Sequence, residues 1–338
     1  MNSPVYRGSV CRIAQLDGLD WQPLPRKRWA TGDYVVGEVT HAGAPSALVE
    51  LCNGRLIHVE VGDLVVGAFG IRHATLEATG TWEAIGDDHT FDAMTGAGLF
   101  GEITSVSPFL PRTTRLRYRG HVLRDGQKVT MRQETAAPPP DAAPWSTPTI
   151  LIVGSSMSAG KTASGRIVVR RLKRMGLKVL AAKLTGAGRY RDVLTMGDAG
   201  ADWIYDFVDG GMPSTVCDPD AYRTHTTDLL ARMQQHQPDV AVIEAGASPL
   251  EPYNGKTAVE LLGDSVVLRI LAASDPYAVL GIQTAFAFTP DLVAGIATNT
   301  DAGIELIETL TSLPALRLID AEALPMLDDL LARALQAK

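Results

Sequence analysis

The stretch that most constrains the fold is GSSMSAGKT, residues 154–162, which directly follows the apolar run ILIV. A phosphate-binding loop usually has the pattern GxxxxGK followed by Ser or Thr. Here Ser155 stands where that pattern has its first glycine, and Gly154 lies one residue earlier. Such a loop needs a buried strand before it and a helix after it. The apolar run and the residues after 162 supply both, which favours a phosphate-binding loop over an ordinary strand-to-helix turn.

Each residue type near the end of the stretch has a definite use in binding phosphate. We expect the backbone N–H groups of Ser158, Ala159, Gly160, Lys161 and Thr162 to point at the phosphates, helped by the positive end of the helix dipole. Lys161 would neutralise the β and γ phosphates, and the Thr162 hydroxyl would bind Mg²⁺. A side chain at Gly160 would block the phosphate. The stretch therefore predicts binding of Mg-ATP, and GTP remains open.

Apolar runs alternate with helical stretches throughout residues 149–338. The runs lack strict alternation, as expected for parallel strands covered on both faces. Expected strands begin at Thr149, Leu177, Asp239, Ser265, Leu292 and Leu316. Expected helices begin near Lys161, Asp192, Asp220, Thr257, Pro276, Asp301 and Ala321. The pattern predicts an α/β domain with a doubly wound parallel sheet.

The first part of the chain has a different pattern. Residues 1–132 contain short β-branched runs between glycines and aspartates, which predict a mainly β domain, a barrel or a sandwich. GDYVVGEV at 32–39 recurs as GDLVVGAF at 62–69, which suggests two strands entered by the same turn, although so short a match also arises by chance. Residues 133–148 are rich in proline and predict a linker between the domains.

Composition narrows the class of protein. A chain of 338 residues is long enough for two domains, and its net charge of −7 argues against general nucleic-acid binding. The basic run at 170–178 is interpreted as the solvated face and end of a helix. Three widely spaced cysteines predict reduced thiols. We find no signal-peptide pattern and no run of membrane-spanning length, so we expect a cytoplasmic protein.

The loop resembles that of dethiobiotin synthetase, in which a glycine and a small hydroxyl residue, here Gly154 and Ser155, precede Gly-Lys-Thr. The resemblance implies that Lys183, in AAKLTGAG, lies near the substrate and the transferred phosphoryl group. It also implies that Glu244, at the end of an apolar run, is the acidic magnesium residue. Asn299, in ATNTD, matches an asparagine that contacts the nucleotide base, with plain turn chemistry as the alternative.

A second resemblance covers most of residues 150–300. The order of TGAG, DFVDGG and IEAGASPLEPYNGKTAVELLG is similar to that of a P-loop family described as D-glutamate N-acetyltransferases. The first half of that family is Rossmann-like, whereas residues 1–132 look β-rich. Two further acids have open roles: Asp198 is a second magnesium carboxylate or an exposed helix charge, and Asp206 is a substrate contact or a surface residue on a helix shared with Trp203.

The favoured function is activation of a carboxylate or carbamate by phosphoryl transfer from Mg-ATP, as in a ligase or kinase, with Lys161 and Lys183 as catalytic residues. The alternative is an acyl-CoA-dependent N-acyltransferase acting on an amino acid such as D-glutamate, with acetyl-CoA as the cofactor. A nucleotide-switched binding or chaperone protein is a third class. Relatives with this loop are often dimers, so we expect a small-molecule substrate and a homodimer.

Overall fold

The protein forms two compact units, seen here in a computed structural model that describes residues 4–16, 18, 20–43, 48–141, 143–246 and 248–336. The first, termed the β-rich unit, comprises Met1–Ala137, Ala187–Arg191 and Phe207–Asp218. The second, termed the parallel-sheet unit, comprises Pro138–Gly186, Asp192–Asp206 and Pro219–Lys338. Two short segments from the second half of the sequence therefore belong to the first unit, whereas we predicted a single domain over residues 149–338.

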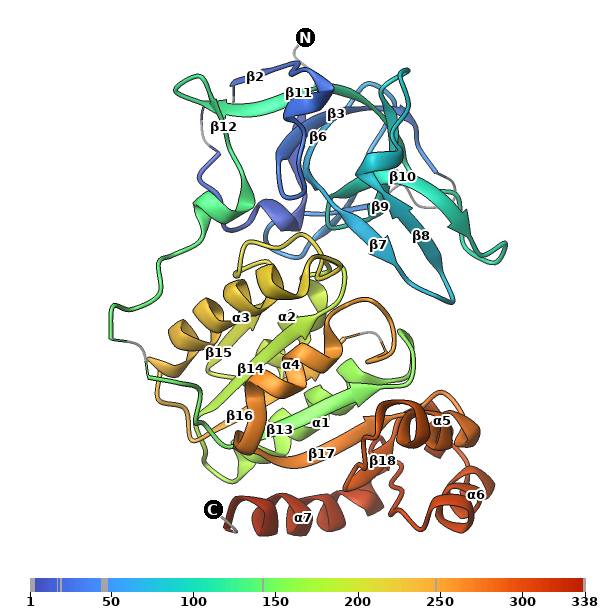
Figure 1. The fold of residues 1–338 in the computed structure, drawn as a ribbon. Helices are drawn as coiled ribbons and strands as arrows, with labels where there is room; N and C mark the ends of the chain where they lie inside the picture. Colours follow the sequence, from blue (N-terminus) through green and yellow to red (C-terminus); the bar gives the residue numbers. More distant parts are fainter. Residues whose placement is uncertain are drawn as a thin grey trace. The chain divides into compact units, whose positions relative to one another are not determined.

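Short strands dominate the β-rich unit (Figure 1). They are β1 (Val5–Arg7), β2 (Asp20–Gln22), β3 (Tyr34–His41), β4 (Leu48–Glu50), β5 (Leu56–His58), β6 (Leu64–Phe69), β7 (Ile71–His73), β8 (Ala78–Thr81), β9 (Thr90–Thr95), β10 (Leu99–Val106), β11 (Arg115–Arg124) and β12 (Gln127–Lys128). Pairing runs β6-β3-β11-β9-β10, and β10 also pairs with β6, so the ring closes into a barrel. Trp29, Phe69, Phe91 and Phe100 are buried in its core. The predicted mainly β class is confirmed.

The repeated Gly-Asp sequence forms two matching turns in this barrel. Gly32 and Gly62 have positive φ angles of 81° and 96°, which glycine adopts without strain. The N–H of each glycine donates to a carbonyl of the other strand, at 2.8 and 2.9 Å. The carboxylates of Asp33 and Asp63 each accept from the backbone N–H three residues earlier, both at 2.8 Å. β3 and β6 pair antiparallel, so the two turns cap opposite ends of one strand pair.

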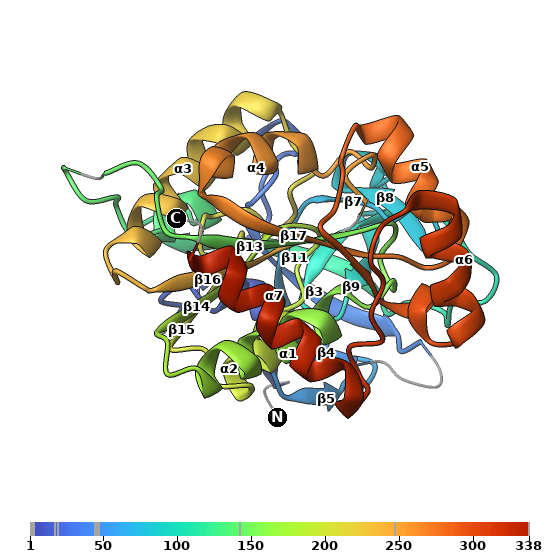
Figure 2. The same ribbon diagram turned by 90° about the horizontal axis from the view of Figure 1, so that it is seen from below.

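The parallel-sheet unit is built around one sheet with strand order β15-β14-β16-β13-β17-β18. Its strands are β13 (Thr149–Gly154), β14 (Val179–Thr185), β15 (Trp203–Asp206), β16 (Val240–Ala245), β17 (Val266–Ala272) and β18 (Leu292–Ala294), and all pair in parallel. Its helices are α1 (Lys161–Arg174), α2 (Arg191–Asp198), α3 (Pro219–Gln234), α4 (Gly255–Leu262), α5 (Pro276–Phe286), α6 (Asp301–Thr311) and α7 (Leu324–Gln336). Figure 2 shows α3 and α4 on one face of the sheet and α1, α2 and α7 on the other. The predicted doubly wound α/β fold is confirmed.

Two local predictions in this unit are wrong. The run from Leu316 is not a strand, since the chain there makes only an isolated bridge between Ala315 and Val293. Trp203–Asp206, which we expected on a helix, is the edge strand β15. Across the described residues, no helix combines the length and the apolar character needed to cross a membrane.

The matching turns allow an internal comparison of stability. Asp33 is fully buried and also accepts a bond from the Lys128 ammonium (2.8 Å) and lies 3.2 Å from the His121 ring, whereas Asp63 has only its turn partner among the described residues. We expect Asp33→Ala to lower the free energy of unfolding by about 3 kcal/mol, because it removes a buried carboxylate together with its contacts to the Ala30 N–H, Lys128 and the buried His121 ring. Asp63→Ala should lower it by about 1 kcal/mol.

The measurement is urea unfolding followed by tryptophan fluorescence, because Trp29 lies in the barrel core with its ring centroid 5.8 Å from that of His121. Equal losses in the two variants would show that the contacts of Asp33 with Lys128 and His121 contribute nothing to stability.

Candidate functional site

A phosphate-binding loop lies at the centre of the parallel sheet. β13, between β16 and β17, ends at Gly154, and α1 begins at Lys161. Gly160 is the N-cap of α1 with a φ of 102°, and no side chain of the described residues caps this end of the helix. The first N–H groups of α1 therefore have no side-chain acceptor. This is the arrangement that binds an anion at a helix N-terminus.

The order Gly154-Ser155 has a physical reason. A Cβ atom on Gly154 would lie 2.5 Å from Cδ and 2.6 Å from Nζ of Lys161, so the lysine side chain occupies the space that a side chain would need. The Ser155 hydroxyl accepts from the Ser274 N–H at 2.9 Å, and the Ser155 N–H donates to the Ala272 carbonyl at 3.0 Å. Glycine makes room for the lysine, and serine attaches the loop to the end of β17.

Lys161 is buried, with only 6% of its surface exposed. Its ammonium donates to the Ser156 carbonyl of the same loop at 2.6 Å. Burial lowers the pKa of Lys161, and the Glu244 carboxylate opposes that shift. A buried cation beside a loop of N–H groups is stabilised by an anionic ligand. The surroundings of Lys161 thus suit a phosphate group.

Glu244 brings the other residues of the site together. It is 1% exposed near the end of β16, and its Oε2 accepts from the Thr162 hydroxyl at 2.9 Å. Carboxylate and hydroxyl oxygens are the ligands that Mg²⁺ prefers, and Mg²⁺ usually keeps several waters and phosphate oxygens. No group of three His, Cys, Asp or Glu able to hold a metal is found among the described residues. Thr162 and Glu244 therefore fit a magnesium ion that arrives with a nucleotide.

Lys183, in β14, lies on the other side of this carboxylate. Its Nζ is 3.6 Å from Glu244 Oε1 and donates to Asp192, the second residue of α2. Burial alone would lower the pKa of Lys183, but the carboxylates of Asp192 and Glu244 outweigh it and raise the pKa above its usual range. Asp206, buried at the end of β15, is the β-sheet partner of Lys183. The carboxylates of Asp192 and Glu244 thus favour the cationic form of the lysine.

Of the two acids whose roles were open, Asp206 is buried beside Lys183 and Asp198 is exposed. Asp198 is the last residue of α2 and is exposed, about 9 Å of helix rise beyond Asp192. The end of the helix that reaches the site is the other one, so the structure contradicts a magnesium ligand at Asp198 and agrees with an exposed helix charge. Asp192 is the residue of α2 that reaches the site, where it accepts a hydrogen bond from Lys183. It was not predicted as a site residue. Its signal was an acidic residue in the first turn of the helix that follows the strand bearing Lys183.

Asn299 lines a cavity of about 190 Å³ that begins at the loop. The cavity is also lined by Gly160, Ser164 and Arg317. The adjoining segment is fixed to the loop, because the Ile296 N–H donates to the Ala159 carbonyl at 3.2 Å. The cavity that Asn299 lines is thus held next to the phosphate-binding loop.

A second cavity, of about 270 Å³, adjoins this one. The two share Ile167, Leu318 and Ile319. The second, termed the arginine groove, is otherwise lined by Arg166, Arg170, Arg171, Arg174 and Leu324. Four guanidinium groups in one concave surface make it suitable for an anion.

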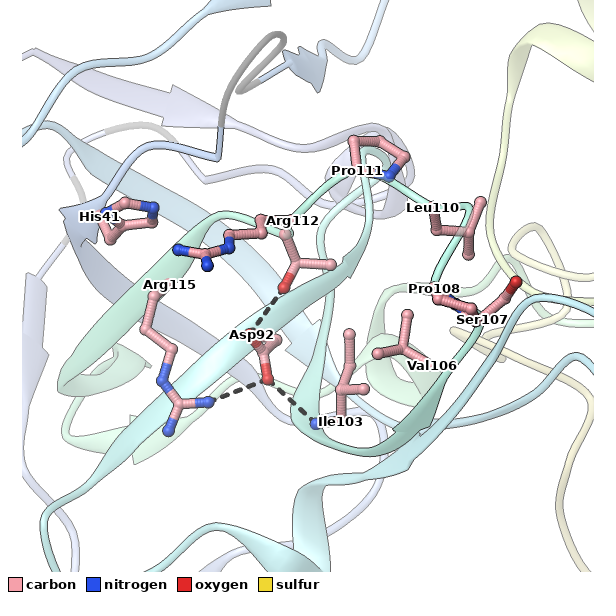
Figure 3. A pocket seen from close by; sticks show the side chains of 11 residues that line it. His41, Asp92, Ile103, Val106, Ser107, Pro108, Leu110, Pro111, Arg112 and Arg115 are labelled. Carbon is pink, nitrogen blue, oxygen red and sulfur yellow. Dashed lines mark hydrogen bonds and ion pairs between the residues drawn. The ribbon is translucent and has the colours of Figure 1, made fainter.

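The β-rich unit has a cavity of its own, of about 540 Å³ (Figure 3). The Asp92 carboxylate accepts hydrogen bonds from Thr113 Oγ1, the Ile103 N–H and Arg115 Nη1 at 2.8, 3.0 and 3.0 Å. These bonds fix one wall of the cavity. Figure 3 shows His41, Arg112 and Arg115 on one side and Val106, Pro108 and Leu110 on the other. The cavity therefore has one polar wall, in which Asp92 neutralises Arg115, and one apolar wall.

No protein-family model matches the chain, and the search of curated proteins gives no match. Similar solved structures include the signal recognition particle receptor FtsY from Elizabethkingia anophelis (16% identity, TM-score 0.36, covering 52% of this chain and 59% of that one). HypB from Helicobacter pylori, in complex with nickel, has 15% identity and a TM-score of 0.39 over 57% and 88% of the two chains. A DUF1611 family protein from Anabaena variabilis has 17% identity and a TM-score of 0.36 over 60% and 62%.

The present chain thus spans 59% of the length of that FtsY chain. At such identities and scores, the assignment of a phosphate-binding loop depends on the geometry of residues 154–162.

Gly154→Ala tests the use of this glycine. The added methyl group would displace the Lys161 side chain, which is flexible, so we expect little change in the thermal unfolding midpoint. Binding of a non-hydrolysable Mg-ATP analogue should weaken roughly tenfold, because the ammonium no longer lies over the loop. The matched control is Gly281→Ala in α5, where an added Cβ meets no atom within 4 Å. Calorimetry measures both variants, and an unchanged affinity in Gly154→Ala would contradict the account.

Proposed function

We propose that the parallel-sheet unit binds Mg-ATP and activates a carboxylate or carbamate by phosphoryl transfer, as a dethiobiotin synthetase-like ligase or kinase. The observation that carries this proposal is the position of Lys183. It is a second buried lysine beside Glu244, the same carboxylate that accepts from Thr162 in the phosphate loop. A buried cation beside the phosphate loop also suits a negatively charged acceptor oxygen, which favours an enzyme over a pure switch.

Each side chain has a role in this scheme. Lys161 and the loop N–H groups hold the β and γ phosphates, while Thr162 and Glu244 hold the magnesium ion. When bound, that ion neutralises charge on the transferring phosphoryl group. Lys183 holds the acceptor oxygen and offsets its negative charge. The contribution of the protein is positioning and electrostatic stabilisation, and an attacking amine needs no general base from the chain.

A second candidate is an acyl-CoA-dependent N-acyltransferase acting on an amino acid such as D-glutamate. The arginine groove favours it, because coenzyme A carries a phosphate on its ribose that ATP lacks. In this scheme the loop holds the diphosphate of coenzyme A, and no nucleotide is hydrolysed. The two candidates differ in their need for magnesium, which an experiment can decide.

Calorimetric titration with a non-hydrolysable ATP analogue, with and without Mg²⁺, tests the leading proposal. We expect magnesium-dependent binding that Lys161→Ala weakens at least a hundredfold, because the variant loses the buried cation at the phosphates. Lys256→Ala, which removes an exposed lysine of α4, is the matched control and should leave the affinity unchanged. Preferential binding of acetyl-CoA without magnesium would overturn the proposal in favour of the acyltransferase.

Glu244→Gln tests the magnesium role separately. The amide keeps the shape of the side chain but removes its charge, so binding of the ATP analogue should lose most of the gain that magnesium gives the wild type, roughly tenfold. Binding of the same analogue in the presence of a chelator should be nearly equal in variant and wild type. A variant that keeps the full magnesium effect would show that Glu244 takes no part in holding the ion.

A further inference from the structure

The arginine groove concentrates positive charge along one side of α1. Arg166, Arg170 and Arg174 follow one another at intervals of four residues, so they lie on one face of the helix. All three are exposed. Like charges at this spacing repel one another and weaken the helix slightly. The chain has a net charge of −7, so this positive cluster is opposite in sign to the net charge of the chain.

The four arginines differ in their partners. Arg171 is bound to Asp328 of α7 through two hydrogen bonds, the Nε–Oδ1 bond being 2.7 Å long, so its charge is already matched. Among the described residues, the side chains of Arg166 and Arg170 have no hydrogen-bond or ion-pair partner, and both line the groove. Their guanidinium groups line a concave surface and can both donate to one anion. Phosphate suits such donors, because guanidinium groups bind phosphate oxygens in pairs.

The groove is placed to receive a group attached to a nucleotide. It shares Ile167, Leu318 and Ile319 with the cavity that contains Asn299 and begins at Gly160. Arg166 lies four residues after Thr162, on the same face of α1 and about 6 Å further along its axis. A ribose lies between the phosphates and the base of any nucleotide. A phosphate on that ribose would therefore be within reach of the Arg166 side chain.

We infer that Arg166 and Arg170 form a second phosphate site that recognises a phosphate on the ribose of the bound nucleotide. The ligand class is an adenine nucleotide with a 5′-diphosphate and a ribose phosphate, as in the nucleotide part of coenzyme A. The inference rests on the proposed binding of a nucleotide in the phosphate loop, which both candidate functions share. If the reaction consumes ATP, ribose-phosphorylated nucleotides compete with it for the site.

The test compares the affinities of ADP and of ADP bearing a 3′-phosphate by calorimetry. A further arm with 2′-phosphorylated ADP distinguishes the position of the ribose phosphate. In the wild type, one of the two ribose-phosphorylated nucleotides should bind at least roughly tenfold more tightly than ADP. The double variant Arg166→Gln, Arg170→Gln should lose this advantage and keep its affinity for ADP within about twofold. Because both arginines are exposed and repel one another, their replacement should not lower the thermal unfolding midpoint.

Lys256→Gln is the matched control, since it removes one exposed charge at a distance in sequence from the groove. It should preserve the preference for the ribose phosphate. Two results would overturn the inference while the proposed function stands: equal affinities for ADP and both phosphorylated forms, or a preference that Lys256→Gln reduces as much as the double variant does. Absence of any binding that depends on Lys161 would overturn both proposals.

Discussion

The site depends on the burial of the Glu244 carboxylate. An isolated carboxylate at 1% exposure is strongly destabilising unless hydrogen bonds and an opposite charge compensate it. Thr162 and Lys183 supply these partners from two different elements, the phosphate-loop helix and the neighbouring strand. These contacts with Glu244 hold the side chains of Thr162 and Lys183 in the site. A charge that is difficult to bury thereby sets the spacing between the phosphate loop and the second lysine.

The parallel sheet explains why these residues meet. Parallel strands place their carboxyl ends at one edge, which is where ligands of doubly wound folds bind. The register puts Glu244 opposite both Ile152 and Lys183, and puts Asp206 opposite Lys183 on the outer side. Lys183 and Glu244, 61 positions apart in sequence, thus become neighbours through strand pairing. Lys183 and Glu244 therefore belong to the inner strands of the sheet.

The sheet also decides which residues of the site the sequence could predict. The positions of Lys161, Lys183 and Glu244 follow from a loop motif and from the ends of long apolar strands, which are local signals. Asp192 reaches Lys183 only because of the path taken by residues 187–191, which no local pattern specifies. β15 escaped prediction because four residues, half of them aromatic, suit helix and strand equally. The run from Leu316 looked like a strand, yet its leucine at 318 is instead buried and lines the cavity beside α1.

The path of the chain bears on how the protein is made. Residues 187–191 and 207–218 belong to the β-rich unit, where Asp209 pairs with Arg12 at 2.8 Å and the Arg191 N–H donates to the buried Glu50. During synthesis from the N-terminus, these contacts form only after Asp218 has been added, some 80 residues after the unit's first segment ends at Ala137. The unit that comes first in the sequence is therefore completed only after part of the parallel-sheet unit has been made. An expression fragment cut within the proline-rich linker would separate it from part of its own structure.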